Sequence, residues 1–262
     1  MKNRLIIILI QVAFFPSYLI SQSLTKERID KLKKSVVKIS VEGTKSGGTG
    51  FFFSTGGDVL TCWHVIEPAL IKDSRGNLID IRKITMQLSD GQIKELGIPT
   101  IFFSDPQLNM LAVSNDFCQL KPVKFEPTIR YSPLKLGTFE EIEEGDEIYT
   151  AGFPLGIPFQ FVSHGILSTK YIDSSLIYSR PGFPSVRIKK SVALLDLTIN
   201  KGNSGGPVIK LGKTPDEDKV IGIVNFLINP FGANAERLNQ NLSIDSVNYI
   251  KSIHPIEIGI FR

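Results

Sequence analysis

The chain has 262 residues, a length that fits one large all-β domain or two fused barrels. Its 30 Lys and Arg against 26 Asp and Glu give a formal net charge of +4, which is too small to indicate a polyanionic partner. No motif that reads RNA or DNA, no metal-ligand spacing of Cys and His and no glycine-rich phosphate loop is present. We therefore expect no nucleic-acid partner, no metal and no cofactor.

The first residues have the composition of an export signal. Lys2 and Arg4 supply the positive start, an apolar stretch follows over 5–15, and residues 21–23 form a small-x-small exit. The apolar stretch is short for the ~20 residues that a membrane-spanning helix needs. We therefore predict a signal peptide over 1–23, a periplasmic or secreted mature protein, and no membrane association once the signal is removed.

After the signal, the pattern changes twice. Apolar residues at helical spacing predict a short leading helix over 24–34, and from residue 35 short strands alternate with turn signals. Such strands are typical of a barrel or a sandwich. A stretch over 126–145 with prolines and an acidic end predicts a link, so that 35–125 forms a first barrel and 146–262 a second one. The second barrel ends in a closing helix, for which Asp245 is the predicted N-cap.

A glycine-built turn over 202–207 carries Ser204. A serine hydroxyl becomes an effective nucleophile only when a base takes its proton and donors stabilise the oxyanion that forms. Gly202 permits a sharp turn, so that the N–H groups of Gly202 and Ser204 can point at one spot. Gly205 and Gly206 leave room for a substrate beside the hydroxyl. An isolated turn of this composition would more simply connect two strands, but the full hexapeptide is far more specific.

The candidate base is His64, which follows a predicted strand over 59–61 and precedes a short helical turn. The other two histidines, His164 and His254, are more simply surface or structural residues. Ser204 and His64 are 140 residues apart, so their chemistry depends on a fold that brings them together.

The motifs and their order resemble the trypsin-like (chymotrypsin-fold) serine peptidases, and most closely the bacterial HtrA/Deg-like protease domain. The matching segments are 46–51, 60–65, 150–156, 163–168, 199–207 and 220–223. The resemblance covers about 35–253 and implies an all-β fold. That fold has two six-stranded antiparallel β-barrels with a short N-terminal helix and a C-terminal helix. It places His64 in the first barrel and Ser204 in the second, with the N–H groups of Gly202 and Ser204 as the oxyanion hole. Many HtrA-like proteins also carry a PDZ module, and we expect none in this sequence.

The resemblance also implies an aspartate at the start of an apolar strand, which accepts the N–H of the histidine and holds its tautomer. The segment 105–113 fits this description, and its spacing places Asn109 at the aspartate's position. An asparagine favours the wrong tautomer, and this change lowered kcat about 10⁴-fold in one serine protease. Two alternatives stay open, in which either Asp105 or an acid elsewhere in the chain supplies the carboxylate.

The substrate pocket is also implied by the resemblance. The residue six before the serine lies at the base of the S1 pocket in this family, and here it is Thr198, next to Ile199. A neutral residue at the bottom of this pocket offers no charged partner to an Arg or Lys side chain of the substrate. We therefore expect cleavage after small or medium apolar residues.

Two further points remain open. Residues 202–206 also match G-x-S-x-G, the nucleophile elbow of α/β-hydrolases, but the sequence after Ser204 favours an extended segment where the elbow needs a helix. Cys62 and Cys118 are compatible with a disulfide, which export permits, or with two buried thiols.

These patterns predict an exported serine endopeptidase that acts on polypeptides through Ser204 and His64 and is weakened if Asn109 replaces the acid. The alternative is a catalytically impaired protein that keeps the peptidase fold and binds peptides or proteins without turnover.

Overall fold

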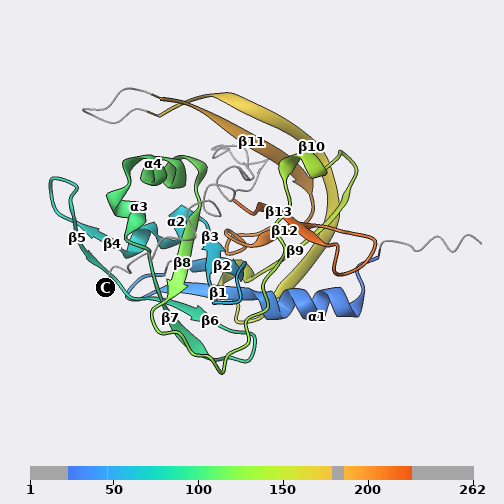
Figure 1. Ribbon diagram of the computed structural model, residues 1–262, viewed down its shortest axis with the longest axis horizontal. Coiled ribbons are helices and arrows are strands. Elements are labelled where there is room, and N and C mark those ends of the chain that lie inside the picture. The colour runs from blue at the N-terminus through green and yellow to red at the C-terminus, as the bar shows by residue number, and fades with distance from the viewer. Residues whose placement is uncertain (1–22, 46, 179–185, 226–262) are drawn as a thin grey trace, which may run out of the picture.

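Six strands close into a barrel in the computed structural model, which describes residues 23–45, 47–178 and 186–225 (Figure 1). Around the barrel the order is β1 (Val36–Val41), β2 (Gly47–Phe52), β3 (Val59–Thr61), β8 (Cys118–Pro122), β7 (Ile93–Gly97) and β6 (Ile84–Gln87). Strand β1 shows why these segments form a barrel wall. Its residues Val37, Ile39 and Val41 are buried, whereas Lys38 and Ser40 between them are only half-buried. This alternation places one apolar face toward the barrel interior.

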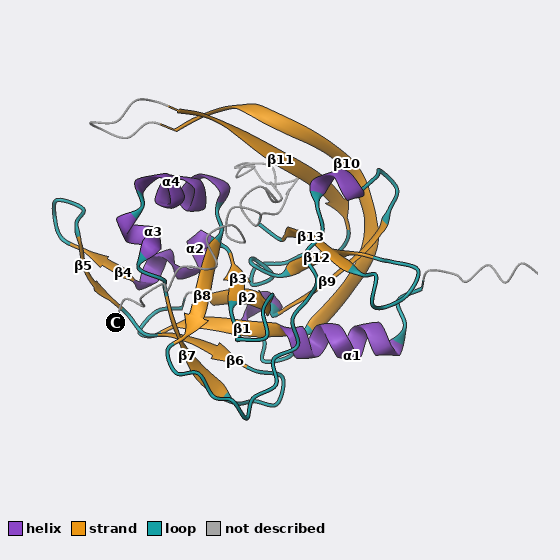
Figure 2. Cartoon of the chain, viewed as in Figure 1, coloured by secondary structure: helices purple, strands orange, loops and turns teal. Residues whose placement is uncertain are grey.

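Short helices and a small hairpin connect the barrel strands and lie outside the barrel (Figure 2). They are α2 (Trp63–Ile66), η1 (Glu67–Ala69), β4 (Leu70–Lys72), β5 (Leu78–Ile81), α3 (Ile101–Ser104) and α4 (Pro106–Asn115). Helices α2 and α4 matter most for function, because they carry or adjoin the candidate catalytic residues of the first barrel.

The second half of the chain forms a five-stranded antiparallel sheet among the described residues. Its order is β11 (Val186–Asp196), β10 (Phe161–Tyr178), β9 (Glu147–Gly152), β12 (Pro207–Lys210) and β13 (Lys219–Ile223), with η2 (Phe139–Glu141) and η3 (Pro154–Gly156) in the connections. Strands β10 and β11 form a long hairpin that arches over the molecule toward α4 (Figure 1). The two halves share a core, since Tyr149 and Ile209 of the sheet belong to the same buried cluster as Val37 and Phe51 of the barrel.

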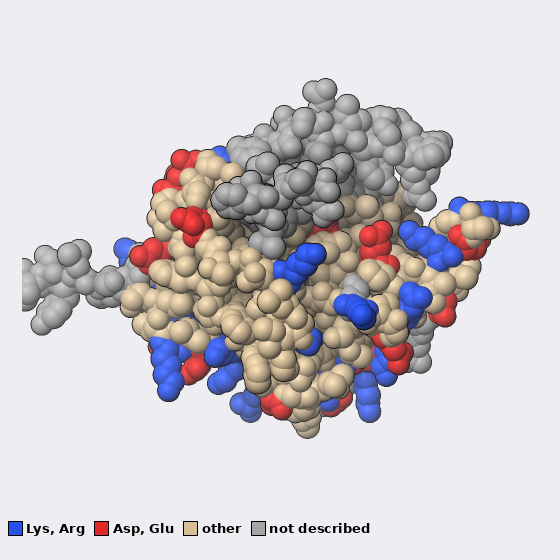
Figure 3. Space-filling view, turned by 180° about the vertical axis from the view of Figure 1, so that it is seen from behind, with Lys and Arg blue, Asp and Glu red and all other residues tan. Residues whose placement is uncertain are grey.

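The architecture confirms the predicted all-β fold with a closed first barrel and a leading helix. The sixth strand of the second barrel and the closing helix predicted after Asp245 lie outside the described residues, as does the predicted signal up to residue 22. Among the residues that are described, no helix has the length and apolar character needed to cross a membrane. On the face seen in Figure 3, basic and acidic side chains are interspersed.

The leading helix α1 (Lys26–Ser35) is joined to the second half of the chain by a buried ion pair. Thr25 caps the helix by accepting the N–H of Arg28. The Arg28 guanidinium lies 2.9 Å from Asp218, with side-chain exposures of 3% and 7%. The carboxylate also accepts the Tyr149 hydroxyl at 2.7 Å and the Gly212 N–H at 2.7 Å. Burial, followed by the hydrogen bond to Asp218, raises the pKa of Tyr149 far above its usual range, so this hydroxyl stays a donor.

We predict that Arg28→Met lowers the free energy of unfolding by about 3–5 kcal/mol, because the Asp218 carboxylate stays buried without its cation. Chemical denaturation of the purified protein measures this loss. Lys31→Met is the matched control, since Lys31 of the same helix pairs with Asp216 where both side chains are exposed, and it should change stability little. Equal effects of the two substitutions would show that the buried pair does not hold the helix.

Candidate active site

His64 lies at the junction of strand β3 and helix α2, where the chain turns from extended to helical geometry. The residues around it are buried: Thr61 and Cys62 precede it, and Trp63 and Val65 flank it. The His64 side chain is 45% exposed. The packed neighbours therefore fix the backbone, while the imidazole reaches the surface.

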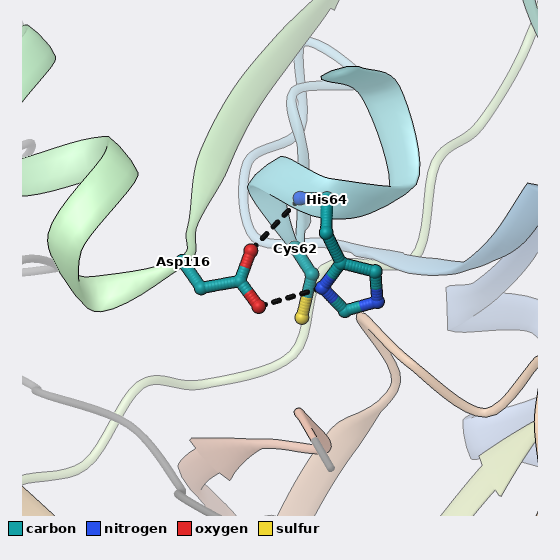
Figure 4. Close-up of side chains that lie close together, drawn as sticks. All are labelled: Cys62, His64 and Asp116. Atoms are coloured by element: carbon teal, nitrogen blue, oxygen red, sulfur yellow. Dashed lines mark hydrogen bonds and ion pairs between the residues drawn. The ribbon is translucent and has the colours of Figure 1, made fainter. Parts of the chain in front are cut away.

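Asp116 contacts His64 at two points, one on the imidazole ring and one on the backbone (Figure 4). Its Oδ2 lies 2.6 Å from His64 Nδ1, and its Oδ1 accepts the His64 backbone N–H at 2.8 Å. The Asp116 side chain is only 16% exposed. An ionised carboxylate only accepts hydrogen bonds, so this contact favours the tautomer with its proton on Nδ1, which leaves the Nε2 lone pair for a substrate-side proton.

The backbone geometry of Asp116 makes this contact possible. Asp116 is the C-cap of α4 and has φ 53° and ψ 53°, in the left-handed region that few non-glycine residues adopt. The left-handed residue ends the helix, and the chain continues through the buried Phe117 into β8. A strained residue at the point where an acid meets a histidine is typical of functional sites.

The prediction that Asn109 or Asp105 stands next to the histidine ring is wrong. Asn109 donates its side-chain amide to the Phe102 carbonyl at 2.8 Å, and Asp105 caps α4 by accepting the N–H groups of Gln107 and Leu108. The physical reason is that the segment is helical: an aspartate N-cap followed by proline at the first helical position starts a helix, not a strand.

A second segment of the sequence has the pattern of an acid before a strand. Asp116 stands just before the buried strand β8, which satisfies the same rule that was applied to the segment 105–113. The short apolar run over 110–113 fits a helix as well as a strand, and periodicity alone does not separate the two.

The Ser204 turn requires glycine on both sides of the serine. Gly202 has φ +98° and Gly205 has φ +86°. A Cβ at Gly202 would lie 2.3 Å from the Phe153 carbonyl oxygen, and one at Gly205 would lie 2.0 Å from the Thr49 carbonyl oxygen. No other side chain fits these positions, so the glycines are required both for conformation and for space.

The turn lies against the segment that carries the histidine. The N–H of Gly205 donates to the Val224 carbonyl at 2.8 Å, and the same carbonyl accepts the Cys62 thiol at 3.3 Å. A Cβ at Gly205 would lie 3.1 Å from the Cys62 backbone nitrogen, two residues before His64. The described residues show no hydrogen bond from the Ser204 hydroxyl to the ring, a contact that often tightens only when substrate binds.

The candidate oxyanion donors are oriented by their neighbouring carbonyls. The Lys201 carbonyl accepts the Leu155 N–H at 2.5 Å, and the Asn203 carbonyl accepts the Gly206 N–H at 2.8 Å. In a trans peptide the N–H points opposite to the C=O, so the N–H groups of Gly202 and Ser204 point away from these contacts. Within the described chain, neither N–H donates to a protein acceptor.

The residues predicted for the S1 pocket occupy different surroundings. Thr198 is exposed, whereas Ile199 is half-buried and packs against the smaller hydrophobic cluster of the second half. The chain beyond Asn225 lies outside the described residues. The role of Thr198 and Ile199 in substrate selection therefore stays a prediction.

Cys62, His64 and Asp116 offer ligand atoms within 4.8 Å of one another (Figure 4). Two of these atoms, however, are joined in the 2.6 Å contact, and the thiol donates to Val224. These bonds satisfy the groups without an ion. Cys62 and Cys118 are buried thiols with no disulfide between them. Burial, and then the charge of Asp116, raises the pKa of the Cys118 thiol far above its usual range, so it is inert.

Comparisons with known proteins bear on the family and the fold. Residues 48–223 match the family model of the trypsin-like peptidase domain. A probable periplasmic serine endoprotease DegP-like from Rickettsia conorii is 26% identical over 214 residues, which cover 80% of this chain and 32% of that protein. The chloroplastic Protease Do-like 1 of Arabidopsis thaliana is 23% identical over 80% of this chain and 39% of its own length. The chain thus spans about a third of the length of these curated relatives.

Two solved structures show the same fold. The Rv3671c protease from M. tuberculosis in an inactive form has a TM-score of 0.57 at 20% identity, covering 88% of this chain and 91% of that one. Deg5 has a TM-score of 0.57 at 24% identity, covering 85% and 90%. The family match extends over two thirds of the sequence and includes both motifs that frame the site. The chain therefore belongs to the trypsin-like peptidase domain family.

Proposed function

We propose that the protein is an active, exported serine endopeptidase in which Ser204 is the nucleophile, His64 the general base and Asp116 the acid that orients it. The observation that carries this proposal is the two-point contact of Asp116 with His64, at 2.6 Å and 2.8 Å. Polypeptides are the substrates that this chemistry serves, and endoproteases are what the relatives are named.

The proposed reaction follows from the orientation of the groups. His64 Nε2 accepts the proton of the Ser204 hydroxyl as its oxygen attacks the scissile carbonyl carbon. The imidazolium that forms is stabilised by the Asp116 carboxylate at Nδ1. The N–H groups of Gly202 and Ser204 donate to the oxyanion, and His64 then returns the proton to the leaving amine. A water molecule activated by the same base hydrolyses the acyl-enzyme.

Export is the second part of the proposal. It is supported by the signal predicted over 1–23 and by a relative whose name places it in the periplasm. Cleavage at the predicted end of the signal would keep the leading helix α1 (Lys26–Ser35) and its Arg28–Asp218 ion pair intact.

The alternative function is a peptide-binding module without turnover, and it rested on the absence of an acid at the histidine. The contact of Asp116 with the His64 ring supports turnover over this alternative.

We predict that Asp116→Asn lowers kcat for peptide hydrolysis by about 10⁴-fold, because the amide no longer holds the Nδ1–H tautomer or balances the imidazolium charge. Asn109→Asp is the matched control and should leave kcat unchanged, since Asn109 bonds to the Phe102 carbonyl and not to the ring. Steady-state kinetics on one fluorogenic peptide measure both variants. A large gain in Asn109→Asp with no loss in Asp116→Asn would return the acid's role to position 109.

A second prediction concerns the nucleophile. A fluorophosphonate probe should label the wild-type protein and fail to label Ser204→Ala, because only a serine activated by a base attacks phosphorus at a useful rate. Ser89→Ala, at an exposed loop position, is the control and should label normally. Mass spectrometry of the labelled peptide identifies the site. Labelling that persists in Ser204→Ala would contradict the assignment.

A further inference from the structure

A groove of about 630 Å³ lies directly beside the Ser204 turn. One wall comes from the first barrel and its β1–β2 connection, and the other comes from η3 and the start of the serine turn. The lining residues used below are Lys38, Lys45, Leu155, Lys201 and Gly202. Because Gly202 is a proposed oxyanion donor, a substrate chain that reaches Ser204 also passes this groove.

The groove carries positive charge and no acid. Lys38, Lys45 and Lys201 line it, and no Asp or Glu is among its lining residues. Within the part of the chain that the structure describes, none of these three lysines forms a salt bridge, and Lys38 donates only to the Gly156 carbonyl, at 3.1 Å. Ammonium groups gathered without a counter-charge at the edge of a site favour an anionic ligand.

One exposed apolar side chain lines the groove together with Gly202 of the serine turn. Leu155 is 69% exposed and has φ 56° and ψ 21°, a left-handed conformation that is unusual for leucine. Its N–H donates to the Lys201 carbonyl at 2.5 Å. This bond keeps the residue in its strained conformation and presents the side chain to solvent beside Gly202. A strained, exposed leucine at this position is best explained by a contact with substrate.

The predicted S1 residues place this groove on the side of the scissile bond that the leaving group would occupy. The residues predicted to receive the side chain before the scissile bond, Thr198 and Ile199, are not part of its lining. The groove instead opens on the other flank of Gly202, against β1 and β2 of the first barrel. An extended peptide advances about 3.3 Å per residue, so the residues just after the cleaved bond meet Leu155 and later ones meet the lysines.

We propose, resting on the proposed peptidase function, that this groove selects substrates on the leaving-group side: an apolar residue directly after the scissile bond, followed within about four residues by acidic ones. Lys45 and Lys201 are specificity-determining residues for the acidic segment, and Leu155 for the apolar residue. The substrate class is therefore a polypeptide with an apolar–acidic sequence just beyond the cleavage site.

Binding to the Ser204→Ala protein tests the acidic preference without turnover. Two fluorescent peptides are compared by anisotropy at low salt, identical except for Asp and Glu, or Asn and Gln, at the second to fourth positions after the bond. The acidic peptide should bind about tenfold tighter, since each exposed ammonium–carboxylate pair contributes about twofold to fivefold. The difference should shrink at high salt, because screening shortens the range of the charges.

The variants decide where the preference resides. Adding Lys45→Gln and Lys201→Gln to the Ser204→Ala protein should abolish the preference for the acidic peptide. Adding Lys72→Gln instead should preserve that preference, because Lys72 is an exposed residue on β4. Equal binding of the two peptides at low salt, or a preference that survives both substitutions, would overturn the proposal. Cleavage of either peptide by the protein with Ser204 intact is measured separately. A protein that binds the acidic peptide more tightly but cleaves neither peptide would contradict the proposed peptidase function and leave the proposed selectivity of the groove standing.

Leu155→Gly tests the apolar part. Glycine adopts a positive φ at no steric cost, so the thermal midpoint should stay the same or rise, which separates lost binding from lost folding. The affinity for a peptide with leucine directly after the scissile bond should fall at least about fourfold, which corresponds to the loss of one buried methylene group. A peptide with glycine at that position should be unaffected. Equal losses for the two peptides would show that Leu155 does not contact that side chain.

Discussion

The double contact between Asp116 and His64 is the constraint on which the site depends. The His64 side chain is 45% exposed, so packing fixes its ring only in part. The carboxylate supplies both an anchor for the backbone, through the His64 N–H, and an anchor for the ring, through Nδ1. Because the two oxygens belong to one rigid group, the ring cannot rotate without breaking a short contact that is largely shielded from water. The left-handed C-cap of α4 is the local cost of placing that group.

Thr49 of the first barrel joins the two halves of the site. Its hydroxyl donates to the Gly202 carbonyl at 2.7 Å and accepts the Phe153 N–H at 3.1 Å. Its backbone N–H donates to the Ser204 carbonyl at 2.8 Å. The Thr49 residue is fully buried, so these bonds are shielded from water and strong. The nucleophile turn is therefore positioned by the same barrel that carries the histidine, which removes most of the freedom between the two units.

The predictability of the fold and site from sequence differs from element to element. The serine turn was predictable because Gly202 and Gly205 adopt a positive φ, a backbone demand that is local in sequence. The strands of the first barrel were predictable from alternation, as β1 shows. The residue that contacts the histidine ring was not predicted, because the apolar run over 110–113 is too short for its periodicity to separate a helix from a strand. Only the Asp105–Pro106 start signal could have favoured the helix.

Hydrogen bonds and ion pairs between residues far apart in the sequence could not be predicted, for a different reason. Arg28 and Asp218 are 190 residues apart, and no periodicity or spacing connects them. The same holds for Thr49 and Gly202, whose bond spans 153 residues. Sequence patterns report which face of an element is buried, whereas such bonds depend on how two completed units pack together.

The bond between the Leu155 N–H and the Lys201 carbonyl links the proposed substrate groove to the oxyanion donors. The peptide unit between Lys201 and Gly202 has its carbonyl held by Leu155 on one side, and this directs the Gly202 N–H to the other. A substrate residue that packs on the Leu155 side chain therefore contacts the residue whose N–H orients the Lys201–Gly202 peptide unit, and with it the proposed oxyanion donor of Gly202. Binding energy from substrate residues after the scissile bond can in this way affect the reacting carbonyl. Interactions there that are stronger in the transition state than in the ground state raise kcat. The strained conformation of Leu155 fits this role, because a residue whose backbone position matters to the chemistry is held by a specific bond and not by packing alone.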